Sequence, residues 1–305
     1  MPYITVCTAT YNRANTLHRP FQSLCRQTFM DFIWLVIDDG SKDNTAEVME
    51  VFQREAPFSI QYIRKENGGR ASALNYSYNY IDTELVINLD SDDALDENAL
   101  KSIHDIWEGL SKSERDRYWC ITGLCKDSVS DKIIGNIWPK DINSLTGKKQ
   151  YRAITRIKRG EKSCCRKTEV LRQNPFPQYE DTTFVPEDIV WCKINHKYDQ
   201  YCTNTVFRIY YRDTENSLSK GGNLGVAHQR SLLYLYNTYF NECFDEFLYN
   251  KNARWSPLGV CRQAIRTDYP FSQTIAGVYS IWKKILIAML WGPIKLYSIL
   301  KECKK

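Results

Sequence analysis

The chain has 305 residues, of which 43% are hydrophobic and 25% are charged, a composition typical of globular proteins that excludes a disordered or low-complexity chain. The formal net charge is +5, yet from Lys251 onward ten Lys and Arg residues stand against Asp268 and Glu302, a net charge of +8 for that segment. This basic charge at the end of the chain argues against a nucleic-acid-binding core. It favours contact between the C-terminal region and an anionic surface.

A cytoplasmic protein is predicted. The chain enters a strand directly after Met1-Pro2, without the basic and apolar regions of a secretory leader. The chain has eleven cysteines, an odd number, and they are scattered along the sequence. This pattern favours reduced, mostly buried thiols. We also find no run of about twenty apolar residues that would span a bilayer.

The first ninety residues alternate between apolar runs and amphipathic segments. Strands are predicted at Tyr3–Thr8, Phe32–Ile37, Ser59–Ile63 and Glu84–Leu89, with helices at Thr16–Gln27, Val48–Phe52 and Gly68–Tyr80. Continuous apolar strands that alternate with helices predict a parallel sheet flanked by helices, an α/β fold. Ligands of such sheets bind beyond the carboxyl ends of the strands, where three polar turns fall. These turns are Tyr11–Arg13, Asp38–Asp43 and Asp90–Asp93.

The turn after the fourth strand holds three carboxylates, Asp90, Asp92 and Asp93, within four residues. Like charges this close repel one another unless a cation neutralises them. Mg²⁺ and Mn²⁺ prefer oxygen ligands and keep open positions for substrate phosphates. A solvated turn that caps the helix beginning near Asp96 is the alternative interpretation.

Two earlier turns carry groups suited to a nucleotide. Asp39, in Asp38-Asp-Gly-Ser41, is a candidate acceptor for an imide N–H such as N3–H of uracil, although residues of this kind also cap helices. Arg70 follows Gly68-Gly69 at the start of a predicted helix, where backbone N–H groups and a guanidinium favour a phosphate. A tight turn with a surface arginine is the alternative for this second motif.

A pair of acids, Glu187 and Asp188, follows Pro186 about a hundred residues later. Proline and two acids suit the first turn of a helix and its dipole. Equally, one of these acids is a candidate general base, which must lie within hydrogen-bond reach of an acceptor hydroxyl. The residues alone leave both interpretations open.

Together these motifs resemble the family 2 glycosyltransferases with the GT-A fold, over roughly residues 1–215 and in the family's order. The matching pieces are Ile4-Thr-Val-Cys-Thr-Ala-Thr-Tyr-Asn-Arg13, Ile37-Asp-Asp-Gly-Ser-Lys-Asp-Asn-Thr45, Asn67-Gly-Gly-Arg70, Leu89-Asp-Ser-Asp-Asp93 and Pro186-Glu-Asp188. The resemblance implies a GT-A catalytic domain over residues 1–215, with a nucleotide-binding half over 1–93 and an acceptor half over 94–215. A helical extension is predicted over 216–305.

The resemblance also implies a role for each matching position. The nucleotide-sugar site is implied at Ala9, Thr10, Tyr11, Arg13, Asp39, Arg70, Asp90 and Ser91. Asp90-Ser-Asp92 matches the D-x-D signature, so a Mn²⁺ or Mg²⁺ site is implied at Asp90, Asp92 and Asp93. Glu187 or Asp188 would supply the base, and the choice between them stays open.

The implied reaction is an inverting transfer of a sugar, usually from a UDP-sugar, to a hydroxyl of a lipid-linked or surface-polysaccharide acceptor. Processive relatives carry Q-x-x-R-W, whereas Thr267 follows Gln263-Ala-Ile-Arg266 here, so one sugar per encounter is expected. A nucleotidyltransferase is an alternative, but Ala9–Arg13 lacks its Gly-rich basic loop. A catalytically silent module that only binds sugar nucleotides is another alternative. The intact acids at Asp92 and Glu187-Asp188 argue against it.

The end of the chain, Ile281–Lys301, combines apolar and aromatic residues with Lys283, Lys284, Lys295 and Lys301. This pattern predicts an amphipathic helix within residues 281–305 that lies on the anionic inner face of the cell membrane. A helix docked on the domain or on a second subunit, and hence a homo-oligomer, is the alternative. No nucleic-acid partner is predicted.

Overall fold

The computed structural model describes residues 2–139, 144–145, 160–212, 225–248 and 250–302. The chain forms two compact units, of which the first contains Met1–Pro175 and Lys197–Ser217. The second contains Phe176–His196 and Leu218–Lys305. The predicted boundary near residue 215 lies close to one of these junctions, whereas the segment Phe176–His196 packs with the C-terminal helices.

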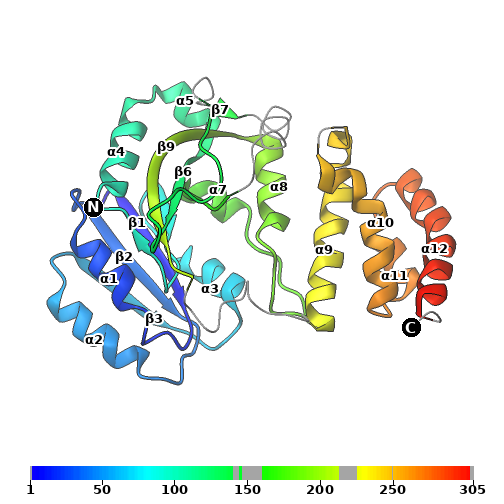
Figure 1. Cartoon of the computed structure of the whole chain (residues 1–305), viewed down its shortest axis with the longest axis horizontal. Coiled ribbons are helices and arrows are strands. Elements are labelled where there is room, and N and C mark those ends of the chain that lie inside the picture. Colours follow the sequence, from blue (N-terminus) through cyan, green and yellow to red (C-terminus); the bar gives the residue numbers. More distant parts are fainter. Residues whose placement is uncertain (1, 140–143, 146–159, 213–224, 249, 303–305) are drawn as a thin grey trace. The chain divides into compact units, whose positions relative to one another are not determined.

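The first unit is built on one sheet with the strand order β3-β2-β1-β4-β8-β6-β9-β5, and β7 pairs with β9 (Figure 1). The strands of the described chain are β1 Ile4–Thr10, β2 Phe32–Asp38, β3 Ser59–Arg64, β4 Leu85–Asn88, β5 Ala94–Leu95, β6 Tyr118–Asp127, β7 Ser144–Leu145, β8 Lys162–Lys167 and β9 Asp199–Tyr210. Strands β1 to β4 run parallel, as predicted. Strand β8 is antiparallel to both β4 and β6. The predicted α/β fold is therefore confirmed.

The described helices of this unit are α1 His18–Cys25, α2 Thr45–Glu55, α3 Arg70–Ser77, α4 Ala99–Gly109, α5 Lys112–Arg117 and α7 Thr168–Gln173. All of them except α5 bury apolar residues against the sheet. Phe21 of α1 and Phe52 of α2 stack with their ring centroids 4.0 Å apart, and both contact the core around the fully buried Trp34 of β2. This apolar layer holds the strand ends, and thus the turns that follow them, in fixed positions.

The second unit is helical, as predicted for the extension. Its helices are α8 Asp188–Lys197, α9 Val226–Glu242, the short 3₁₀ helix η2 Phe244–Glu246, α10 Lys251–Arg266, α11 Phe271–Ala276 and α12 Ile281–Glu302. Helix α10 packs against both α9 and α12, around a core that includes Phe240, Val260 and Ile287 (Figure 1). No helix in the described ranges has both the length and the apolar content needed to cross a membrane.

Candidate functional site

Strand register brings the three polar turns to one edge of the sheet. In the parallel pairs, Thr10 of β1 lies opposite Asp38 of β2, and Cys7 of β1 lies opposite Asn88 of β4. The pairing continues past the strand ends, because the Asp39 amide donates to the Thr10 carbonyl at 2.9 Å. The turns after β1, β2 and β4 therefore begin side by side at the carboxyl edge of the sheet, where α/β proteins bind ligands.

The turns after β1 and β2 are tied together by Asn12. Its backbone takes the left-handed conformation with φ 52°, a geometry that asparagine tolerates better than most residues. The Asn12 amide donates to Ser41 Oγ at 2.9 Å, and Asn12 Oδ1 accepts from the Lys42 amide at 2.7 Å. The neighbouring residue Tyr11 is 43% exposed, while Thr10 is buried in β1. Ala9 and Arg13 are both partly buried.

Asp39 is buried and organises the loop before α3. Its Oδ1 accepts from Lys65 Nζ at 2.8 Å and from the Gly68 amide at 3.0 Å, and its Oδ2 accepts from the Gly69 amide at 2.7 Å. Asn67 Nδ2 donates to the same carboxylate at 3.1 Å. A nucleobase N–H would have to replace one of these donors, so in this structure Asp39 supports the segment that presents Arg70.

Asp90 lies between two arginines from distant parts of the chain. Arg70 Nη2 donates to Asp90 Oδ1 at 2.9 Å, and Arg208 Nη1 donates to Asp90 Oδ2 at 2.7 Å. Burial by itself would raise the pKa of Asp90, but the two guanidinium groups outweigh it and hold that pKa well below its ordinary value. Asp90 is therefore ionised at neutral pH and fixes the position of Arg70.

Asp93 is the most deeply buried acid of this turn, at 1% exposure. Its Oδ1 accepts from the Tyr211 amide at 2.9 Å, and its Oδ2 lies 3.5 Å from Arg208 Nη1. Burial outweighs the arginine and raises the pKa of Asp93 to about 7. The side chain thus faces the interior and strand β9, whereas a metal ligand must face the substrate.

Arg208 contacts the acids of this site but belongs to none of the sequence motifs. It lies on β9, 118 residues from Asp90, and the antiparallel pairing of Leu95 with Arg208 brings it to the turn after β4. The local signal, a cation inside the apolar segment Val206-Phe207-Arg208, carries no recognisable motif. Only the pairing of β5 with β9 identifies its acidic partners.

The predicted metal ligands do not converge in this structure. Among the described residues, no group of three or more His, Cys, Asp or Glu side chains is arranged to hold a metal ion. The physical reason is that Asp90 is paired with two arginines and Asp93 is turned inward. Asp92 is different, since no described residue forms an ion pair or hydrogen bond with its carboxylate. Arg19 instead holds its backbone, with Nη1 donating to the Asp92 carbonyl at 3.2 Å.

One free carboxylate fits Mg²⁺ or Mn²⁺ chemistry. Mg²⁺ is commonly bound through one or two carboxylates together with substrate phosphates and water. Asp92 supplies one such ligand, and the predicted phosphate-binding group Arg70 is held by the adjoining Asp90. The residues present are therefore compatible with a metal that is completed by a diphosphate. Ser91, between the two aspartates, is buried.

The two candidate bases lie in the second unit, at the start of α8. Glu187 precedes the helix and its Oε2 accepts from the indole Nε1–H of Trp191 at 2.9 Å. Asp188 is the first residue of α8, is exposed, and its Oδ2 accepts from the Tyr239 hydroxyl at 3.4 Å. The Trp191 contact holds Glu187 in one orientation, whereas the longer contact of Asp188 is weak.

Comparison with known proteins agrees with this arrangement. The family Glycosyl transferase family 2 matches residues 5–118, which include the turns after β1, β2 and β4. The chain is therefore similar to glycosyl transferase family 2 over this segment. An uncharacterised glycosyltransferase of Nostoc sp. is 33% identical over 105 residues, which are 34% of this chain and 33% of that protein. The chain thus spans about a third of that relative.

Longer similarities come from two proteins of Staphylococcus aureus. The poly(ribitol-phosphate) beta-N-acetylglucosaminyltransferase TarP is 25% identical over 235 residues, which cover 75% of this chain and 69% of TarP. The crystal structure of TarS residues 1–349 in complex with UDP-GlcNAc superposes with a TM-score of 0.63 and 14% identity, over 98% of this chain and 92% of that one. This likeness confirms the predicted GT-A fold.

Proposed function

We propose that this protein is an inverting, metal-dependent glycosyltransferase of family 2 that moves a sugar from a UDP-sugar to a hydroxyl of a lipid-linked or surface-polysaccharide acceptor. One observation carries the proposal. Strand register places the turns that carry Tyr11 and Asp92 at the carboxyl edge of the parallel strands, and Asp90 holds Arg70 at the same edge. The UDP-GlcNAc bound to TarS and the polymer named for TarP support the donor and acceptor classes.

In the proposed donor site, one segment binds the nucleobase and another binds the diphosphate. The exposed Tyr11 ring stacks on the nucleobase, with the backbone of Ala9 and Thr10 and the side chain of Arg13 beside it. Arg70 contacts the diphosphate from the N-terminus of α3, where backbone N–H groups also favour negative charge. Asp90 keeps this guanidinium in place through the 2.9 Å contact. Ser91 belongs to the turn that carries these groups.

Asp92 is the proposed protein ligand of Mn²⁺ or Mg²⁺. Such an ion, when bound, neutralises the charge that develops on the leaving diphosphate. Asp90 and Asp93 position Asp92 for the ion, because their contacts with Arg208 and Tyr211 fix the turn on both sides of Asp92. Glu187 or Asp188 removes the proton from the acceptor hydroxyl as that oxygen attacks the anomeric carbon.

A screen of sugar nucleotides tests this assignment. We expect UDP-sugars to raise the melting temperature more than GDP- or CMP-sugars, and to do so most strongly with Mn²⁺, because ligands stabilise the state that binds them. The measurement is differential scanning fluorimetry, followed by an assay of slow UDP-sugar hydrolysis. A larger shift with GDP- or CMP-sugars would refute the uracil assignment. Binding without hydrolysis would favour the silent sugar-nucleotide-binding module.

The buried Asp39 gives a second test of the donor site. Replacement by Asn is expected to weaken UDP affinity at least about tenfold, because loss of one charged hydrogen bond costs about 1.5–3 kcal/mol. The neutral amide cannot accept from Lys65, Gly68 and Gly69 together, so the loop before Arg70 loses its anchor. Isothermal titration with UDP measures the effect, and the exposed Asp31→Asn is the control. Equal UDP affinity in both variants would exclude this role.

We also propose that residues 281–305 attach the enzyme to the anionic inner face of the cell membrane. Support comes from the basic end of the chain and from α12, where apolar residues lie on the exposed side. This location suits a lipid-linked acceptor. Self-association through the same helix is the alternative, and sedimentation analysis separates the two.

A further inference from the structure

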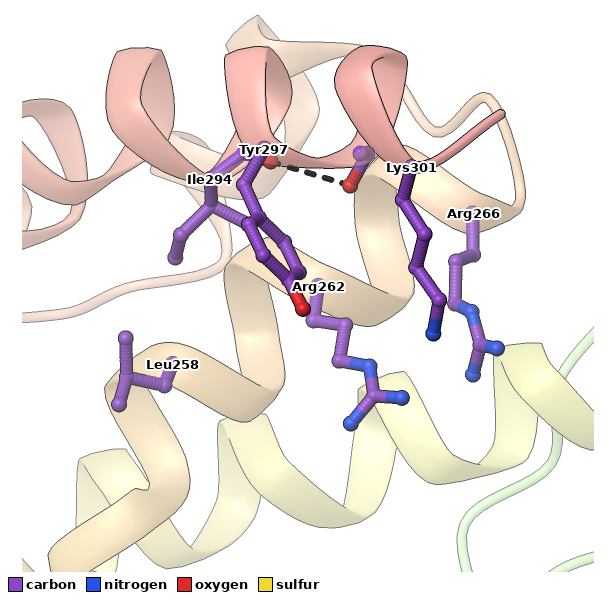
Figure 2. A pocket seen from close by; sticks show the side chains of 7 residues that line it. Leu258, Arg262, Arg266, Ile294, Tyr297 and Lys301 are labelled. Atoms are coloured by element: carbon purple, nitrogen blue, oxygen red, sulfur yellow. Dashed lines mark hydrogen bonds between the residues drawn. The ribbon is translucent and has the colours of Figure 1, made fainter. Parts of the chain in front are cut away.

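A pocket of about 430 Å³ lies between α10 and α12 of the helical unit. Its lining residues are Leu258, Arg262, Arg266, Ile294, Tyr297, Ser298 and Lys301. Figure 2 shows Lys301 extending from α12 toward Arg262 and Arg266, which project from neighbouring turns of α10. The described lining therefore contains three cations and no acid.

The three cations have no anionic partner in the part of the chain that the structure describes. No ion pair or hydrogen bond joins the side chains of Arg262, Arg266 or Lys301 to any of the residues that the structure describes. Arg262 and Arg266 are four residues apart on one helix, a spacing at which like charges destabilise the helix. An anion bound between them removes this repulsion, and the planar guanidinium groups suit the oxygens of a phosphate.

Apolar groups adjoin the cations. Leu258 and Ile294 line the pocket, and Tyr297 lines it while being 67% exposed. Tyr297 thereby connects the pocket with the exposed side of α12, where Ile285, Met289, Leu296 and Leu300 are 54%, 63%, 59% and 54% exposed. A soluble anion would leave this apolar surface in water, whereas an anion joined to an apolar body would cover it.

We propose that the pocket between α10 and α12 binds the phosphate of a lipid headgroup, while the exposed apolar side of α12 enters the interfacial layer of the membrane. The combination of an apolar stripe with cations at its edge is the pattern of interfacial helices. A second copy of the chain fits less well, because a two-fold contact through this surface would place both copies of the basic patch in one interface. The proposal rests on the membrane association proposed above, and not on sugar transfer.

Vesicle flotation tests the pocket. We expect the full chain to bind phosphatidylglycerol vesicles and to bind phosphatidylcholine vesicles weakly. The triple variant Arg262→Gln, Arg266→Gln, Lys301→Gln should bind phosphatidylglycerol on the order of a hundredfold less, because each basic residue near an anionic leaflet contributes about fivefold. A matched triple variant removes the same charge from the exposed residues Arg26, Lys112 and Lys132 of the other unit. It should bind like the wild type.

Each other outcome decides against the proposal. Equal vesicle binding by the two triple variants would show that the pocket has no part in attachment. Binding of soluble glycerol phosphate without vesicle binding would assign the site to a free phosphate ester. A dimer that dissociates only in the pocket variant would assign the surface to a second copy. Circular dichroism and the single variant Arg266→Gln check folding, and UDP affinity, measured in parallel, reports separately on the donor site.

Discussion

Replacement of Asp92 by Asn is expected to lower sugar transfer by about 10³-fold or more while the fold stays intact. The rate falls because a metal clamp stabilises the charge of the transition state by several kcal/mol. The fold is spared because the carboxylate of Asp92 forms no ion pair or hydrogen bond with any described residue, unlike Asp90 with its arginines. Transfer assays give the rate, and urea denaturation gives the free energy of unfolding.

Metal removal gives a readout that does not depend on turnover. UDP affinity of the wild type should fall sharply in EDTA and recover with Mn²⁺, whereas Asp92→Asn should bind UDP weakly under both conditions. The exposed Asp82→Asn, close to β4, is the matched control and should behave like the wild type. Tight binding of UDP by the wild type in EDTA would overturn the assignment of Asp92.

The second large effect concerns the base at the start of α8. Of Glu187→Gln and Asp188→Asn, the variant that removes the base should lose about 10²–10⁴-fold in turnover. Its UDP affinity should stay normal, because a general base contacts the acceptor and not the nucleotide. The other variant should retain most of its activity. Steady-state rates with donor and acceptor, combined with UDP titrations, separate these effects.

Both base substitutions keep a hydrogen-bond acceptor at the start of α8. Glu187→Gln keeps an oxygen that accepts from Trp191, and Asp188→Asn keeps one that accepts from Tyr239, so neither should unfold the helical unit. The exposed Glu180→Gln serves as the control for charge loss in the same segment. Near-normal rates in both base variants would mean that the two acids only stabilise the N-terminus of α8 and that another group acts as the base.

The sequence predicted the architecture because the relevant information is local. Apolar runs of strand length and helical periodicity identified β1 to β4 and the helices between them, with boundaries within a few residues of those in the structure. The chemistry of turns placed Tyr11, Asp39 and Asp92 directly after strands. Parallel pairing then requires those turns to share one edge of the sheet, so a site at that edge follows from the sequence alone.

Only the tertiary structure decided what each acid does. Asp39, Asp90 and Asp93 are equivalent in the sequence, as aspartates in turns, yet one anchors a loop, one holds two arginines and one is buried with a raised pKa. The surroundings of Asp90 and Asp93 depend on Arg208, 118 residues beyond Asp90, and on the pairing of β5 with β9. Asp39 instead accepts hydrogen bonds from Lys65 and from the loop before α3. Residue spacing encodes neighbours on one strand or helix, whereas burial and ion pairing depend on which strands meet.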